Sequence, residues 1–186
     1  MRNQNLLNYL EKVLEHMPTD WLLLTTHRLD IYNEQLAKTE FLDAFESLYE
    51  NKVYSTSALS KLPTAFDYIR LGHPLSSVLE WAVAGLHGLQ PKQVVAFASQ
   101  TMPVLAVLRK NLLEDKLTRI YYLDKSPKAF DFDALKQVYG YQFEVKEVND
   151  TEDIHSFEGI TIFISEASSL RAIDLHPSID ILVHLD

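Results

Sequence analysis

The sequence predicts an α/β protein with a mainly parallel sheet and flanking helices, preceded by a helical N-terminal segment. Two observations predict this class. Before about residue 90, apolar residues recur at the spacing of amphipathic helices. From residue 93 onward, expected strands alternate with helical stretches, and the first of these strands, residues 93–98, is an apolar run without polar alternation, typical of a strand covered on both faces. We therefore expect a helical extension over residues 1–65 and an α/β domain over residues 66–186.

Helices dominate the prediction for the first 90 residues. A first helix face ends at Pro18 and consists of Leu6, Leu10, Val13, Leu14 and Met17. A second, looser face consists of Leu36, Leu42, Phe45, Leu48 and Tyr49. A third helix is predicted over residues 74–87, because Pro74 suits a first helical position and Gly88 supplies a stop. The short apolar run at residues 21–26 fits either a helix or a strand.

Strands and helices alternate in the prediction for the remainder of the chain. The expected strands cover residues 93–98, 119–123, 142–148, 160–165 and 179–185. The expected helices cover residues 102–114 and 131–139, the second with Asp131 as its N-cap and Gly140 at its end. Strands separated by helices predict parallel pairing within one sheet.

Composition excludes several classes of function. The 186 residues, 47% of them apolar, can bury one sizeable core, but a net charge of −9 argues against a nucleic-acid partner. No cysteine is present, which excludes disulfides and thiolate metal sites and fits a cytoplasmic location. No apolar run approaches the roughly 20 residues that a membrane helix needs. Motifs of P-loops, dinucleotide-binding turns, hydrolase elbows and zinc proteases are absent.

The most specific pattern in the chain begins at Tyr68. Tyr68 and Arg70 precede Gly72-His73-Pro74; Leu79-Glu80, the stretch 84–88 (AGLHG) and the stretch 97–99 (FAS) follow in order. Further on, residues 179–186 form an apolar run that ends in Asp186. In order and spacing, residues 66–186 resemble the N-terminal half of pyridoxal-phosphate-dependent enzymes of cysteine and methionine metabolism, the cystathionine lyase and synthase group.

The resemblance implies a partial large domain of the pyridoxal-phosphate (PLP) transferase fold and a cofactor site. Tyr68 and Arg70 would reach the cofactor phosphate of a neighbouring subunit, which implies a homo-oligomer, a dimer or a tetramer. The turn Ser99-Gln100-Thr101 would offer backbone N–H groups to the same phosphate, and Asp186 would pair with the pyridine nitrogen. The implied activity is a lyase or transferase reaction on a sulfur amino acid, by α-proton abstraction and elimination or replacement at the side chain.

The chain also departs from the family pattern. Gln100 stands where the family has glycine, and Pro127 falls at the position of the ring-stacking tyrosine. No lysine matches the Schiff-base motif, which in the family lies beyond the aspartate that aligns with Asp186. We therefore expect a fragment or a shortened relative that is inactive by itself. The alternative is a degenerate α/β module, a pseudoenzyme that serves binding or assembly without catalysis.

Each candidate residue also has a simpler explanation. Tyr68 fits a half-buried aromatic residue, and Arg70 fits a solvated partner of Asp67. Ser99 and Thr101 fit ordinary helix caps. Asp186 fits an exposed carboxylate. It shares one strand face with His184, but no third metal ligand lies nearby in the sequence, so no metal site is expected.

Overall fold

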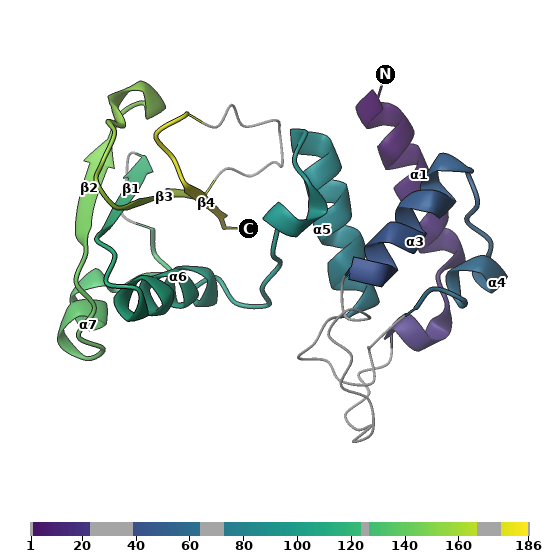
Figure 1. Ribbon diagram of the computed structural model, residues 1–186, viewed down its shortest axis with the longest axis horizontal. Coiled ribbons are helices and arrows are strands. Elements are labelled where there is room, and N and C mark those ends of the chain that lie inside the picture. The colour runs from purple at the N-terminus through teal and green to yellow at the C-terminus, as the bar shows by residue number, and fades with distance from the viewer. Residues whose placement is uncertain (1, 23–38, 64–72, 124–126, 167–175, 186) are drawn as a thin grey trace. The chain divides into compact units, whose positions relative to one another are not determined.

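The structure divides into a helical unit and an α/β unit. It is a computed structural model that describes residues 2–22, 39–63, 73–123, 127–166 and 176–185. The compact units are residues 1–96, here the helical unit, and residues 97–186, here the α/β unit (Figure 1). The helical unit contains α1 (Arg2–His16), η1 (Thr19–Leu22), α3 (Thr39–Glu50), α4 (Thr56–Leu59), α5 (Pro74–His87) and η2 (Pro91–Gln93).

The α/β unit follows the alternation predicted from the sequence. Its elements are α6 (Met102–Leu113), β1 (Thr118–Leu123), α7 (Phe132–Gln137), β2 (Glu144–Val148), η3 (Thr151–Asp153), β3 (Ile160–Ser165) and β4 (Ile181–His184). The four strands form one sheet in the order β2-β1-β3-β4, and every pair in it is parallel. The predicted α/β class with a parallel sheet is therefore confirmed.

Aromatic rings form the core of the helical unit. The ring of Trp81 on α5 contacts three other rings edge-on, those of Tyr9 on α1 and of Phe45 and Tyr49 on α3. The Trp81 indole N–H also donates a hydrogen bond to the Glu46 carboxylate. Because one side chain of α5 contacts both other long helices, α5 is an integral part of this unit.

The ends of α5 agree with the local signals in the sequence. Pro74 is its first residue, and the Nδ1 atom of His73 accepts a hydrogen bond from the Leu75 amide at 3.2 Å. Gly88 follows the helix with φ of 68°, a left-handed conformation that glycine adopts without a steric penalty. The predicted helix over residues 74–87 is confirmed at both ends.

The division into units differs from the one expected from the sequence. We expected α5 to belong to a domain that begins at residue 66, whereas the structure groups it with the N-terminal helices and divides the chain after Ala96. The physical reason is the apolar face of α5, where Val78, Trp81 and Ala82 join the core cluster of α1 and α3. Helical periodicity shows that such a face exists but does not identify its partner.

The two faces of the sheet are covered differently. On one face, α6 and α7 pack on β-branched strand residues; this cluster includes Val104, Leu108, Ile120, Leu135, Ile162, Ile164 and Val183. The other face carries a smaller cluster of Tyr121, Val148, Ile154 and Phe163. Both faces of β3 are buried, whereas β1 is buried at Thr118, Ile120 and Tyr121 and exposed at Leu123.

The predicted strand at residues 93–98 is wrong. Gln93 ends the short 3-10 helix η2, and residues 94–98 belong to no strand. The Ala96 N–H donates to the carboxylate of Glu80 at 2.8 Å instead of to a neighbouring strand. Val95 is 62% exposed and Phe97 43% exposed, so the run is not covered on both faces. A strand needs a hydrogen-bonded neighbour, which an apolar run alone does not supply.

Smaller differences concern element ends. The expected helix at residues 131–139 is shorter, from Phe132 to Gln137, although Asp131 caps it as predicted by accepting from the Ala134 amide at 2.9 Å. The strands expected at 142–148 and 179–185 begin two residues later than predicted, at Glu144 and at Ile181. Helix and strand ends depend on cap and ladder hydrogen bonds that periodicity does not specify.

Candidate functional site

Polar residues lie at the carboxyl edge of the sheet. They include the predicted turn Ser99-Gln100-Thr101 and also Ser165, which was not predicted. All strands are parallel, so their carboxyl ends lie at one edge. Helix α6 lies on the sheet and connects to β1 through residues 114–117, so it runs antiparallel to β1 and begins at this same edge. After β1 the chain forms β2 on one side of that strand and then crosses to form β3 on its other side, so the direction of strand addition reverses at β1. Such switch points in open α/β sheets are where ligands bind.

The turn Ser99-Gln100-Thr101 precedes the first turn of α6. The hydroxyls of Ser99 and Thr101 lie 3.1 Å apart, and the Thr101 N–H donates to the Ser99 hydroxyl at 3.4 Å. Ser99 and Gln100 are exposed and Thr101 is half-buried. Thr101 occupies the N-cap position but makes no side-chain capping bond. Its expected role as an ordinary cap is therefore not realised, and its hydroxyl pairs with that of Ser99 instead.

The amides at the start of α6 complete this arrangement. Pro103 has no N–H, and the Leu105 N–H donates to the Thr101 carbonyl at 3.2 Å. The amides of Met102 and Val104 have no acceptor within the helix, as in the first turn of any α-helix. Gln100 is not among the described residues with positive φ, so the turn accommodates a side chain where the family pattern has glycine.

Ser165 and His184 form a second polar pair at this edge. They end β3 and β4 and are Cα partners in the parallel register. His184 is half-buried, and its two ring nitrogens are shielded from solvent and lack a hydrogen-bond partner in the part of the chain that the structure describes. Sequence reasoning noted His184 but missed Ser165. The available signal was that both residues directly follow the apolar runs of predicted strands.

Three predicted site residues lie outside the described residues. These are Tyr68, Arg70 and Asp186. Their suggested roles toward a phosphate or a pyridine nitrogen therefore stay predictions. Among the described residues, no group of three or more metal-ligating side chains comes together.

The residues at the carboxyl edge fit the phosphate end of PLP. Two hydroxyls and the amides of a helix N-terminus are donors, and the positive end of the helix dipole favours a dianion. The Ser99 and Thr101 hydroxyls lie close enough, at 3.1 Å, to bind one phosphate group together. The donors of this turn fit the phosphate group of the cofactor.

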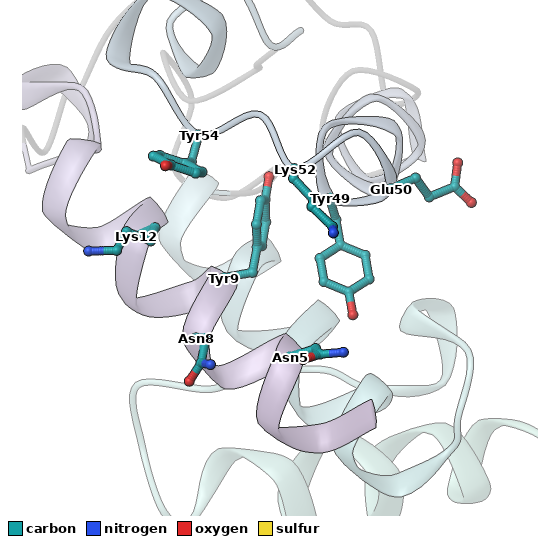
Figure 2. Close-up of a pocket in the computed structure, with 8 residues that line it drawn as sticks. All are labelled: Asn5, Asn8, Tyr9, Lys12, Tyr49, Glu50, Lys52 and Tyr54. Carbon is teal, nitrogen blue, oxygen red and sulfur yellow. The ribbon is translucent and has the colours of Figure 1, made fainter. Parts of the chain in front are cut away.

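A separate pocket lies within the helical unit and was not predicted from the sequence. Its volume is about 420 Å³, and it is lined from α1 and from the end of α3 and the residues after it (Figure 2). Three tyrosines and two asparagines contribute to the lining: Asn5, Asn8, Tyr9, Tyr49 and Tyr54. These residues are far apart in the sequence, so no local motif marks them.

Comparison with protein-family models, with curated proteins and with solved structures finds no match to this chain. No helix in the described ranges is long and apolar enough to cross a membrane.

Proposed function

We propose that the α/β unit is the cofactor-binding part of a PLP-dependent lyase or transferase of sulfur amino acids, with the turn Ser99-Gln100-Thr101 as its phosphate anchor. The supporting observation is the placement of this turn, with its paired hydroxyls, at the N-terminus of α6 and at the carboxyl edge of a parallel sheet. The family assignment rests on the sequence resemblance of residues 66–186.

Each residue has a defined task in this proposal. The hydroxyls of Ser99 and Thr101 and the first amides of α6 hold the phosphate. Arg70 and Tyr68 add a guanidinium fork and a hydroxyl from the partner subunit of a homo-oligomer. Asp186 keeps the pyridine nitrogen protonated, and the bound cofactor then supplies an electron sink for the α-carbon of an amino-acid substrate.

Binding without turnover is the behaviour expected of these 186 residues. In the family, a lysine beyond the aspartate that aligns with Asp186 holds the cofactor covalently. No lysine of the sequence matches that motif. We therefore expect this chain to bind PLP reversibly through its phosphate and to be catalytically inactive by itself.

The test is a titration of the chain with PLP and, separately, with inorganic phosphate, followed by phosphorus NMR. The double variant Ser99→Ala/Thr101→Ala removes both hydroxyls, and we expect at least a tenfold loss of affinity for each probe, about 1.4 kcal/mol. Equal affinity in the parent and the double variant would overturn the assignment of the phosphate to this turn.

The helical unit offers a matched control. Ser55 precedes α4, and its hydroxyl lies 3.4 Å from that of Ser57, a similar pair at a helix start. The variant Ser55→Ala/Ser57→Ala should leave binding of both probes unchanged. If it weakens binding as much as the Ser99/Thr101 pair does, the loss has a general cause and the proposal fails.

One observation favours the non-catalytic alternative, a binding or assembly module. Large apolar side chains are exposed at the amino edge of the sheet, where α6 and α7 end: Leu112 (55%), Leu113 (78%), Leu117 (63%), Val138 (76%) and Tyr139 (58%). Exposed apolar patches mark interaction surfaces. Sedimentation of the chain and of the variant Leu113→Glu/Val138→Glu distinguishes the two functions. A variant that loses both self-association and PLP affinity supports a cofactor site completed by a partner subunit. A variant that loses self-association and keeps its PLP affinity contradicts the contribution of Tyr68 and Arg70 from a partner.

A further inference from the structure

The pocket of the helical unit has the size and composition of a small-molecule site. Its volume of about 420 Å³ falls within the range of roughly 300–1,000 Å³ that such sites occupy. Figure 2 shows α1 on one side, with Asn5, Asn8 and Tyr9, and the end of α3 with Tyr49 on the other. Its lining combines aromatic rings with a few polar groups, as ligand pockets commonly do.

The tyrosines give the pocket flat apolar walls. The rings of Tyr9 and Tyr49 meet edge-on, with centroids 5.0 Å apart and planes at 74°. The Tyr9 hydroxyl donates to the Val53 carbonyl at 2.8 Å, which fixes its ring. Burial, with a smaller contribution from Glu46, raises the pKa of Tyr9 to about 12, so its hydroxyl keeps the proton that it donates to Val53. An aromatic ligand would find edge-to-face partners here.

The charge of the pocket comes from Lys52. The ammonium of the other lining lysine, Lys12, is paired with Glu15 at 2.7 Å, and in Figure 2 it points away from the pocket, as does the carboxylate of Glu50. Within the described ranges, the Lys52 ammonium has neither an ion pair nor a hydrogen bond. One unpaired positive charge beside aromatic walls suits a ligand with one negative charge.

The backbone at Lys52 adds a conformational argument. Lys52 has φ of 55° and follows α3, with its N–H donating to the Tyr49 carbonyl and the Val53 N–H donating to the Leu48 carbonyl. This pair of bonds is the Schellman motif, in which glycine is the usual residue at the left-handed position. A lysine at this position carries a conformational penalty that glycine would not. A function of the lysine side chain would account for its presence there.

We propose that this pocket binds a small aromatic carboxylate. The ring packs against the tyrosines that line the pocket, the carboxylate pairs with the Lys52 ammonium, and the carboxamide of Asn5 donates a further hydrogen bond. This site lies in the helical unit and does not depend on the proposed PLP site.

The test uses benzoate, benzamide and cyclohexanecarboxylate as probes of the full chain, with binding followed by heteronuclear NMR. Benzoate at millimolar concentration should shift the amide signals of residues 49–54 and of Tyr9. Benzamide, which lacks the charge, and cyclohexanecarboxylate, which lacks the aromatic ring, should each bind at least tenfold more weakly. Absence of shifts at these residues, or binding of benzamide or of cyclohexanecarboxylate as tight as that of benzoate, would overturn the proposal.

Variants at Lys52 separate binding from folding. Lys52→Gly removes the ammonium and suits the positive φ, so the chain stays folded while benzoate affinity falls at least tenfold. Lys52→Met tests the charge with the length of the side chain largely kept, and the same loss is expected. Lys61→Met, at an exposed lysine outside the pocket, should change nothing. Retained benzoate affinity in either Lys52 variant contradicts the proposal.

Discussion

The two units of the molecule fill their cores with different chemistry. In the helical unit, the rings of Tyr9, Phe41, Phe45, Tyr49 and Trp81 form a network of contacts with centroids 5.0–6.2 Å apart. In the α/β unit, the cluster between the sheet and its helices contains mainly branched aliphatic residues; its fully buried members include Val104, Ile120 and Ile162.

This difference follows from the shapes of the surfaces that meet. Three helices that cross leave wide, irregular gaps, which large rings fill with few side chains. A pleated sheet presents a regular surface on which β-branched residues pack closely. Loss of one ring should therefore leave a larger cavity in the helical unit than loss of one isoleucine leaves in the α/β unit.

The largest expected effect is at Phe45, whose side chain is 0% exposed and contacts the rings of Tyr9, Phe41 and Trp81. Phe45→Ala should lower the free energy of unfolding by about 3–5 kcal/mol, and Ile120→Ala by about 2–4 kcal/mol. Hydrogen exchange in each variant locates the loss. We expect Phe45→Ala to reduce protection in α1, α3 and α5 first, and Ile120→Ala to reduce it in the sheet.

If either variant lost hydrogen-exchange protection equally in both units, the expected difference between the units would be contradicted. Such a loss would mean that the two cores unfold as one cooperative body. A smaller change, Phe45→Leu, keeps most of the apolar volume and should recover much of the stability if cavity size is the cause.

A smaller effect is expected at two helix ends, one in each unit, where the described residues include a non-glycine residue with positive φ. Lys52 follows α3 with φ of 55°, and Asp115 follows α6 with φ of 53°. Lys52→Gly and Asp115→Gly should each raise the free energy of unfolding by about 0.5–1 kcal/mol, since glycine adopts this conformation without steric cost. Chemical denaturation measures both changes.

The increase in the free energy of unfolding can be compared between Lys52→Gly and Asp115→Gly. The Lys116 N–H donates to the Asn111 carbonyl at 2.8 Å, so Asp115 occupies the same Schellman position after α6 that Lys52 occupies after α3. An equal gain at both sites indicates that neither side chain contributes to stability. A loss of stability in Lys52→Gly would show instead that the lysine stabilises the unliganded fold.

The smallest expected effect concerns pH and is confined to the helical unit. Burial lowers the pKa of His73 below its ordinary value of 6.5, and a backbone hydrogen bond with Trp21 opposes this only in part. Below pH 6.5 the unfolded chain therefore binds more protons at this residue than the folded chain. Its contribution to stability is present above that pH and is lost as the pH falls through the lowered folded-state pKa.

The structural cause is the cap of α5. The neutral Nδ1 atom of His73 accepts the Leu75 N–H, and protonation removes this acceptor. His73→Asn keeps a capping side chain without the titration, so the difference in stability between about pH 8 and about pH 5.5 should be smaller in this variant than in the parent. Unchanged pH dependence would show that His73 does not titrate between these conditions.

Local signals explain most of what was predicted correctly from the sequence. Pro74 and Gly88 define the ends of α5, and Asp131 caps α7, because each acts through the conformation or hydrogen bonds of its own neighbourhood. The strands at 119–123 and 160–165 were predicted correctly because a long apolar run in a parallel sheet needs no alternation. Similar reasoning failed at residues 93–98, where the apolar run has no strand beside it.

The candidate site was predicted only in part. The turn Ser99-Gln100-Thr101 and the start of α6 were predicted because strand, turn and helix signals follow one another in the chain. The pairing of Ser165 with His184 depends on the register between β3 and β4, which is a non-local property. The pocket near Lys52 joins α1 to the end of α3, and no short stretch of sequence contains it.

The sequence by itself therefore determined the helices with capped ends, the alternation of strands and helices after residue 100, and the parallel character of the sheet. Backbone conformation and side-chain periodicity depend on residues that are close together in the sequence, so a short stretch of sequence is enough to predict these features. Only the tertiary structure decided that α5 belongs with α1 and α3, that residues 93–98 form no strand, and which polar residues share the carboxyl edge. Those outcomes depend on which apolar faces and strand edges meet across long stretches of chain.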